Sequence, residues 1–265
     1  MPQPMVNILP EKSISASYGP KPLQNFDLYL PQGRTDTGTK LLIIIHGGAW
    51  VSGDKADMNF VMNDVKRIFP GWAVANINYT LATMPANNVF PTQENDVLAL
   101  MNYMYARRTE YAISNKWVLL GASAGGHLAM LQGYKYTSPI VPKAIVNYFG
   151  PSDMVDTYQR PQSIFVDTSS FRTLLSGTPT SNPASYYQSS PINFVSAQSP
   201  ATITFQGTND ILVPVRQQDA LHAKLTAAGV PNVKKIYSGE GHGFTAAAMA
   251  DSYVLVKNFI DTYVR

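Results

Sequence analysis

The chain has 265 residues, of which 45% are hydrophobic and 14% charged, with a net charge of +3 and no cysteine. This composition supports a single large domain with a substantial core. The small, scattered basic excess argues against nucleic-acid binding, and the lack of cysteine excludes disulfides and a cysteine nucleophile. No apolar run is long enough for a membrane span, and residues 1–10 lack a signal-peptide pattern. We expect a soluble monomer or homodimer, either cytoplasmic or exported after signal removal.

The predicted elements alternate between strands and helices along the chain. Residues 26–30 alternate like a strand, the continuous apolar run 41–45 predicts a strand buried on both faces, and 58–69 has helical spacing. The alternation continues with a strand at 72–78, a helix at 96–111, a strand at 117–120, a helix at 126–136, strands at 143–148 and 201–205, a helix at 215–228, a strand at 233–237 and a helix at 246–263. This order predicts an α/β fold with a mostly parallel sheet of about eight strands and helices on both faces.

One segment departs from this alternation. Residues 151–200 are rich in Ser, Thr, Tyr, Gln and Pro and show weak periodicity. Such a long irregular segment within one domain is typical of a functional loop, so we interpret it as a lid over a site. It carries five aromatic residues, namely Tyr158, Phe165, Phe171, Tyr186 and Tyr187. These either line an apolar pocket or anchor the lid to the core.

The motif Gly121-Ala122-Ser123-Ala124-Gly125 lies between a predicted strand and a predicted helix. A strand that turns sharply into a helix forces the central residue into a strained conformation, and glycine relieves the crowding on either side. The serine hydroxyl then projects at the carboxyl edge of the sheet, where α/β folds bind ligands. We therefore predict that Ser123 is a nucleophile.

A second motif, His46-Gly47-Gly48-Ala49-Trp50, follows the apolar strand directly. Acyl transfer passes through an oxyanion that needs two or three backbone N–H groups aimed at one point. We expect the amides of Gly48, Ala49 and Ala124 to supply them. We expect His46 to support this loop by hydrogen bonding and Trp50 to pack beneath it. We also predict that His46, Trp50 and Tyr79 bind the substrate.

The base is sought among four histidines, at positions 46, 127, 222 and 242. His127 and His222 lie within predicted helices, where we expect packing roles. His242 lies between two glycines in a loop after the last predicted strand, which allows close approach to a nucleophile. It also fits the chain order nucleophile, acid, histidine of this kind of site.

The acid that orients the imidazole is predicted to be Asp210, in the turn that follows the strand at 201–205. Its rival is Asp153, which follows the preceding strand. Glu240 is too near His242 in sequence and is expected to point away from it. Histidines and carboxylates do not recur at metal-ligand spacing, so neither a metal nor a cofactor is expected.

Together these motifs resemble the bacterial esterases grouped with feruloyl and acetyl-xylan esterases (BD-FAE-like), and more distantly the hormone-sensitive-lipase-like carboxylesterases. The resemblance covers nearly the whole chain and implies an α/β-hydrolase fold. It rests on the two motifs above and on Gly53-Asp54-Lys55, Asn78-Tyr79, Gly126-His127-Leu128, Gly207-Thr208-Asn209-Asp210, Val213-Pro214 and Gly241-His242-Gly243-Phe244. Ala49 departs from the third glycine of the usual H-G-G-G, and Gln206 stands where many relatives carry His.

The expected activity is hydrolysis of a carboxylic ester through an acyl-enzyme, with activity rising from pH 5 to 8 because the base must be neutral. The expected substrate is a small-molecule or carbohydrate ester, with a short-chain or carbohydrate-linked acyl group of acetyl or feruloyl type. The first alternative is an amide hydrolase of the arylformamidase type, which uses the same loop and triad. A second alternative is a non-catalytic binding module on the same fold.

Overall fold

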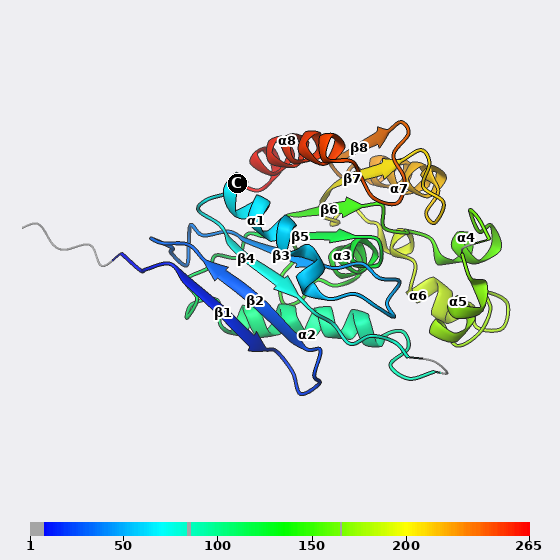
Figure 1. Ribbon diagram of the computed structural model, residues 1–265, viewed down its shortest axis with the longest axis horizontal. Coiled ribbons are helices and arrows are strands. Elements are labelled where there is room, and N and C mark those ends of the chain that lie inside the picture. Colours follow the sequence, from blue (N-terminus) through cyan, green and yellow to red (C-terminus); the bar gives the residue numbers. More distant parts are fainter. Residues whose placement is uncertain (1–7, 84–85, 165) are drawn as a thin grey trace, which may run out of the picture.

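The computed structural model describes residues 8–83, 86–164 and 166–265, and its centre is an eight-stranded sheet in the order β1-β2-β4-β3-β5-β6-β7-β8 (Figure 1). The strands are β1 (Lys12–Ser17), β2 (Asn25–Leu30), β3 (Leu41–Ile45), β4 (Ala73–Ile77), β5 (Trp117–Ala122), β6 (Ala144–Tyr148), β7 (Ala201–Gly207) and β8 (Asn232–Tyr237). Only β2 runs antiparallel to its neighbours; all other pairs are parallel. The predicted α/β fold is confirmed.

The apolar run of β3 lies in the middle of the sheet and contributes to a core on each face. Leu42 and Ile44 belong to one buried cluster, while Leu41, Ile43 and Ile45 belong to the other. All five side chains are fully buried. Because successive side chains of a strand point to opposite faces, a continuous apolar run places apolar side chains in the core on each face of the sheet.

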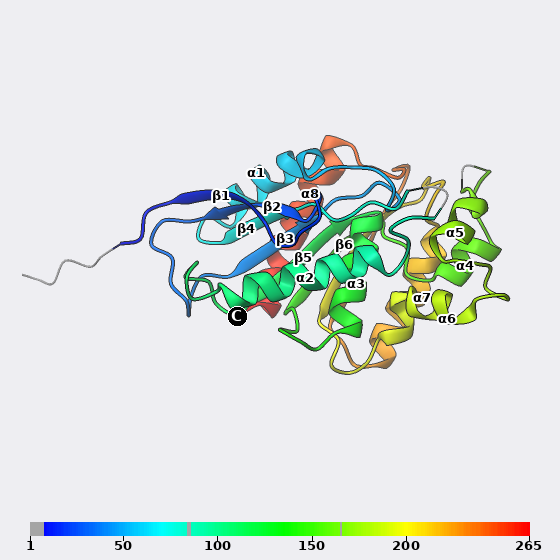
Figure 2. The same cartoon turned by 90° about the horizontal axis from the view of Figure 1, so that it is seen from below.

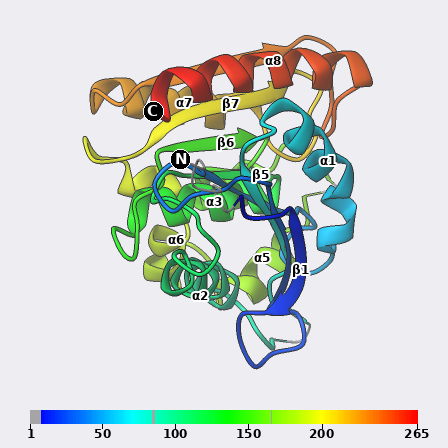
Figure 3. The same ribbon diagram turned by 90° about the vertical axis from the view of Figure 1, so that its left-hand side faces the viewer.

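Helices cover both faces of the sheet (Figures 2 and 3). On one face, α1 (Asn59–Ile68) and α8 (Ala246–Tyr263) pack in the core that holds Leu42, whereas α2 (Thr92–Ala106), α3 (Ala124–Lys135) and α7 (Val215–Ala227) pack in the other. A 3₁₀ turn, η1 (Lys55–Met58), precedes α1. None of the helices in the described residues is long and apolar enough to cross a bilayer.

Strand β1 and helix α2 differ from the sequence prediction. The edge strand β1 was not predicted, because most of its residues are exposed and only Ile14 and Ala16 pack against the core. Helix α2 begins at Thr92 and ends at Ala106, earlier at both ends than the predicted 96–111. Its first turn buries Gln93 and Glu94. Because these two side chains are polar, apolar periodicity did not indicate that the helix begins there.

The segment 151–200 is more regular than its composition indicated. It contains α4 (Met154–Gln159), α5 (Thr168–Leu174), α6 (Pro183–Gln188) and the 3₁₀ turn η2 (Pro191–Phe194). The side chains of Asp153, Asp167 and Asn182 accept a hydrogen bond from the first turn of α4, α5 and α6, respectively. Such N-caps stabilise helices too short to show apolar periodicity. Strands β5, β6 and β7 direct their carboxyl ends toward this segment (Figure 1).

Candidate active site

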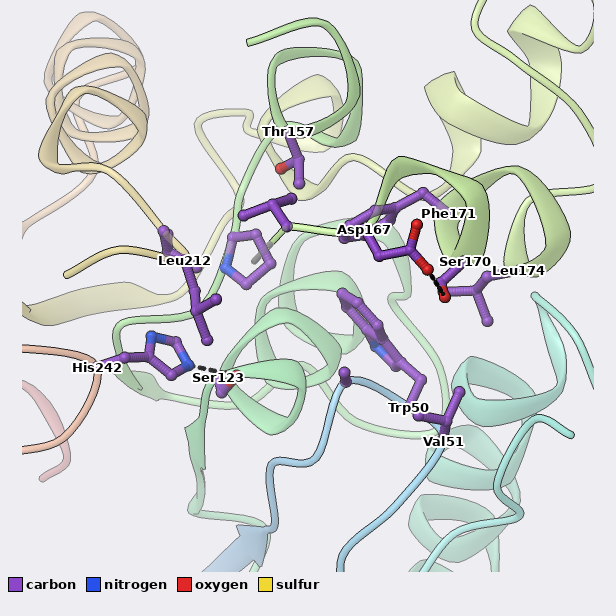
Figure 4. A pocket seen from close by; sticks show the side chains of 14 residues that line it. Trp50, Val51, Ser123, Thr157, Asp167, Ser170, Phe171, Leu174, Leu212 and His242 are labelled. Carbon is purple, nitrogen blue, oxygen red and sulfur yellow. Dashed lines mark hydrogen bonds between the residues drawn. The ribbon is translucent and has the colours of Figure 1, made fainter. Parts of the chain in front are cut away.

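Three side chains from distant parts of the chain meet at the carboxyl edge of the sheet. The Ser123 hydroxyl lies 2.8 Å from His242 Nε2, and His242 Nδ1 lies 2.8 Å from Asp210 Oδ2. Ser123 follows β5, Asp210 follows β7 and His242 follows β8. Figure 4 shows the imidazole directed at the serine across the floor of a pocket. The structure therefore brings together the serine, histidine and acid that the sequence predicted as a triad.

The backbone at Ser123 has the strained geometry of a nucleophile elbow. Its φ of 53° and ψ of −123° place a non-glycine residue in a region that L side chains rarely adopt. The flanking glycines are required by close approach. A Cβ at Gly121 would lie 2.2 Å from the Gly125 carbonyl, and one at Gly125 would lie 2.1 Å from the carbonyl oxygen of Ile45.

The Asp210 carboxylate is buried and accepts four hydrogen bonds. Oδ1 accepts from the backbone N–H groups of Leu212 and Val213, and Oδ2 accepts from His242 and from Gln206 Nε2. Burial alone raises the pKa of Asp210. The hydrogen bond and charge of His242, together with the two backbone donors, outweigh burial and hold the pKa below its usual value.

The other two carboxylates considered from the sequence, Asp153 and Glu240, make hydrogen bonds elsewhere. Asp153 accepts a hydrogen bond from the backbone N–H of Asp156 and caps α4. Glu240 accepts from both the backbone N–H and the hydroxyl of Thr245, at the start of α8. Asp210 is therefore the carboxylate that the structure pairs with His242.

His242 lies between the buried acid and the open pocket. Its side chain is 17% exposed, whereas that of Asp210 is 0% exposed. The ring of Phe149 packs against the imidazole with 4.7 Å between the ring centroids. Phe149 itself has a φ of 43°. A histidine held on one side by an acid and on another by an aromatic ring keeps a fixed orientation toward the serine.

The loop after β3 runs directly beside the serine. A Cβ at Gly47 would lie 3.2 Å from that of Ser123. The next residues have positive φ values, of 108° at Gly48, 51° at Ala49 and 64° at Trp50. Within the described residues, the amides of Gly48 and Ala49 have no hydrogen-bond acceptor. Ala124 opens α3, where backbone N–H groups have no intrahelical partner. These amides are free to bind an oxyanion.

The placement of His46 and Tyr79 corrects their predicted role in substrate binding. His46 is 1% exposed and Tyr79 is 0% exposed, and neither lines the pocket. Their rings stack with 4.3 Å between centroids, and the Tyr79 hydroxyl donates to the carbonyl oxygen of His46. His46 Nδ1 lies 2.7 Å from the Gly47 carbonyl oxygen. Both residues support the loop from behind, because an aromatic layer fills the space between the loop and the core.

A pocket of about 210 Å³ opens in front of Ser123 and His242 (Figure 4). Its other lining residues come from the loop after β3, from the segment 151–200 and from the turn after Asp210: Ala49, Trp50, Val51, Pro151, Thr157, Val166, Asp167, Ser170, Phe171, Leu174, Leu212 and Val213. Trp50 packs edge-to-face against both His127 and Phe171. Trp50 therefore both supports the loop and forms a pocket wall.

The five aromatic residues of the segment 151–200 divide between the two expected roles. Phe171 lines the pocket. Tyr186 is fully buried and packs edge-to-face with Tyr158, so this pair anchors the segment to the core. Tyr187 is 52% exposed, and Phe165 lies outside the described residues.

The sequence prediction missed most of the pocket walls. Leu212 and Val213 lie two and three residues after Asp210, so their position close to the acid was an available signal. No sequence signal pointed to Val166, Asp167 and Leu174, because only the packing of α5 brings these residues to the pocket. No three His, Cys, Asp or Glu side chains gather as a potential metal site in the ranges that the structure describes.

A mostly parallel eight-stranded sheet with a serine, histidine and aspartate at its carboxyl edge defines the α/β-hydrolase fold. The match to a family model is more specific. The chain belongs to the BD-FAE family, whose model matches residues 26–225. This confirms the resemblance inferred from the motifs.

Known proteins of similar sequence and structure include esterases. The chain is 26% identical to Esterase LipC of Mycobacterium tuberculosis, over 86% of this chain and 58% of the relative. It is 26% identical to the Kynurenine formamidase-like hydrolase fscH of Fusarium equiseti, over 49% and 52% of the two chains. The chain thus spans about half the length of these curated relatives. A carbohydrate esterase from gut microbiota shares the fold, with a TM-score of 0.75 and 23% identity over 93% of this chain and 96% of that one.

Proposed function

We propose that this protein is a serine carboxylesterase in which Ser123 is the nucleophile, His242 the general base and Asp210 the residue that orients the base. One observation carries the proposal. The hydroxyl, the imidazole and the carboxylate form an unbroken hydrogen-bonded chain, with 2.8 Å at each link. Membership of the BD-FAE family and the similarity to Esterase LipC support the ester as substrate.

The direction of these hydrogen bonds assigns the proton positions. Asp210 is an acceptor only, so His242 donates its Nδ1–H to the carboxylate and leaves the Nε2 lone pair facing Ser123. Nε2 takes the hydroxyl proton as Oγ attacks the ester carbonyl, and a C–O bond forms. His242 then returns this proton to the departing alcohol as the original ester C–O bond breaks. Water repeats the cycle and releases the acid.

The tetrahedral intermediate carries a negative charge on the former carbonyl oxygen. The amides of Gly48, Ala49 and Ala124 are the proposed donors to this oxygen. Backbone donors held by a rigid loop need no rearrangement when the charge develops, and each is typically worth about 10²–10³ in rate. The stacked pair His46 and Tyr79 provides that rigidity from behind the loop.

The pocket favours a small acyl group. Its volume of about 210 Å³ is below the range of roughly 300–1,000 Å³ that holds drug-sized ligands. Its walls are largely apolar, with Trp50, Phe171 and Leu174 across from the serine. We propose short-chain or carbohydrate-linked acyl esters, of acetyl or feruloyl type, and the small volume of the pocket favours the acetyl type.

The test combines labelling with a substrate panel. A fluorophosphonate probe is expected to label the protein, and Ser123→Ala is expected to abolish both labelling and hydrolysis of p-nitrophenyl acetate. Ser13→Ala, at an exposed position on β1, serves as the control and retains both. Labelling of Ser123→Ala would overturn the assignment. Absence of labelling in the unaltered protein would favour a non-catalytic binding module.

A second candidate function is hydrolysis of a formamide. It is favoured by the similarity to the Kynurenine formamidase-like hydrolase fscH and uses the same three residues. Comparison of kcat/KM for p-nitrophenyl acetate and N-formylkynurenine separates the two functions. Acetylated xylan and methyl ferulate then distinguish the two proposed acyl types.

A further inference from the structure

Gln206, at the end of β7, contacts the acid of the proposed triad. Its side chain is 0% exposed. The amide nitrogen Nε2 donates to Asp210 Oδ2 over 2.7 Å and to the Val213 carbonyl oxygen over 2.9 Å. Both partners are acceptors, so the nitrogen of the amide must face them and the oxygen must face the other way.

The oxygen of this amide is held by a second buried glutamine. Gln218, on α7, is also 0% exposed. Its Nε2 donates to Gln206 Oε1 over 3.3 Å and to the Gly150 carbonyl oxygen over 2.9 Å. Its Oε1 lies 3.4 Å from Nδ2 of Asn147 on β6. The orientation of Gln206 is therefore fixed by the turn after β7, by Gln218 of α7 and, through Gln218, by Asn147 of β6.

Gln206 completes the hydrogen bonding of the Asp210 carboxylate. A carboxylate offers about four lone-pair positions. Leu212 and Val213 fill two on Oδ1, and His242 and Gln206 fill two on Oδ2. A carboxylate held at all four positions cannot rotate away from the imidazole. Because an amide is neutral, this donor adds no charge to the site.

We propose that Gln206 is a positioning residue of the hydrolytic reaction, which holds Asp210 in the orientation that His242 requires and limits how tightly the imidazole binds its proton. The proposal rests on the proposed serine hydrolase function. A donor on Oδ2 withdraws part of the charge that would otherwise stabilise the protonated imidazole. Gln206 thus affects the rate through geometry and the pH dependence through charge.

The test replaces the amide by an apolar side chain of similar shape. Gln206→Met is expected to lower kcat about 10- to 100-fold, the usual effect of losing a hydrogen bond to a charged group, with KM little changed. The acid limb of the pH profile of kcat/KM is expected to move to higher pH, because the carboxylate then holds the His242 proton more tightly.

The control is a matched amide–carboxylate pair away from the triad. Gln24 Nε2 donates to the buried carboxylate of Asp96 over 2.7 Å, the same distance as from Gln206 to Asp210. Gln24→Met therefore removes the same kind of bond, and it is expected to affect stability but neither kcat nor the pH profile.

A second variant keeps the proposal falsifiable if Gln206→Met does not fold. Gln206→Leu removes the same donor with a different apolar side chain, so its kcat should fall and its acid limb should move to higher pH, as for Gln206→Met. A folded variant with an unchanged profile and kcat would refute the role of Gln206. Failure of the serine hydrolase assignment is distinguishable, because the unaltered protein would then not be labelled at Ser123.

Discussion

Replacement of Asp210 by asparagine is the sharpest test of the proton arrangement in the triad. The substitution preserves the size of the side chain but replaces one acceptor oxygen by an NH₂ group. The Oδ1 position faces two backbone donors, Leu212 and Val213, so the amide oxygen is expected to occupy it. The NH₂ group then faces His242 and the Gln206 amide, both of which are donors in the unaltered protein.

This arrangement predicts a large loss of activity without a large change in structure. His242 can accept from an NH₂ group only at an unprotonated Nδ1, so its proton must move to Nε2, where the lone pair was needed for Ser123. The equivalent change in other serine hydrolases lowers kcat by about 10⁴. We expect a loss of about 10³–10⁴ in kcat for Asp210→Asn, with substrate binding retained because Asp210 does not line the pocket.

The assay is the steady-state hydrolysis of p-nitrophenyl acetate between pH 5 and 9, with kcat and KM determined separately. Asp153→Asn is the matched control, because asparagine caps a helix about as well as aspartate and Asp153 has no contact with His242. A loss below tenfold for Asp210→Asn, or an equal loss in both variants, would refute the assigned tautomer.

Two further predictions concern the groups around the pocket. Burial lowers the pKa of His127 to about 4, below the ordinary value of about 6.5. Between these two pH values the unfolded chain binds more protons at this residue than the folded protein does. The free energy of unfolding therefore falls by about 3 kcal/mol as the pH is lowered through this window. Urea unfolding at pH 7, 5.5 and 4.5 should show that His127→Gln lacks this part of the acid sensitivity, whereas a parallel decline in both proteins would contradict it. Asp167→Asn retains the cap of α5 but removes a negative charge from the pocket wall. The preference for acetylcholine over its neutral isostere 3,3-dimethylbutyl acetate should therefore fall by up to about fivefold, and an unchanged ratio would show that Asp167 does not sense substrate charge.

Short-range sequence features were enough to predict the central sheet and the three residues that meet at its edge. The glycines around Ser123 are required by contacts within a few residues and with the adjacent strand. The apolar run 41–45 requires burial on both faces. The parallel order of the strands then places the turns after β5, β7 and β8 at one edge. These features depend on local chain geometry and on periodicity, which the sequence displays directly.

The tertiary structure decided how the site is enclosed and supported. The edge strand β1 and the short helices α4, α5 and α6 form through pairing or capping, so their sequences carry little apolar periodicity. His46 and Tyr79 lie behind the loop rather than in the pocket because their rings stack on each other in the core. The sequence by itself determined which residues could perform acyl transfer. Only the packing of distant segments determined which side chains form the pocket walls, because such contacts depend on the order of elements in space rather than along the chain. Gln206 lies four residues before the acid that it contacts, but its amide is also held by Gln218 of α7.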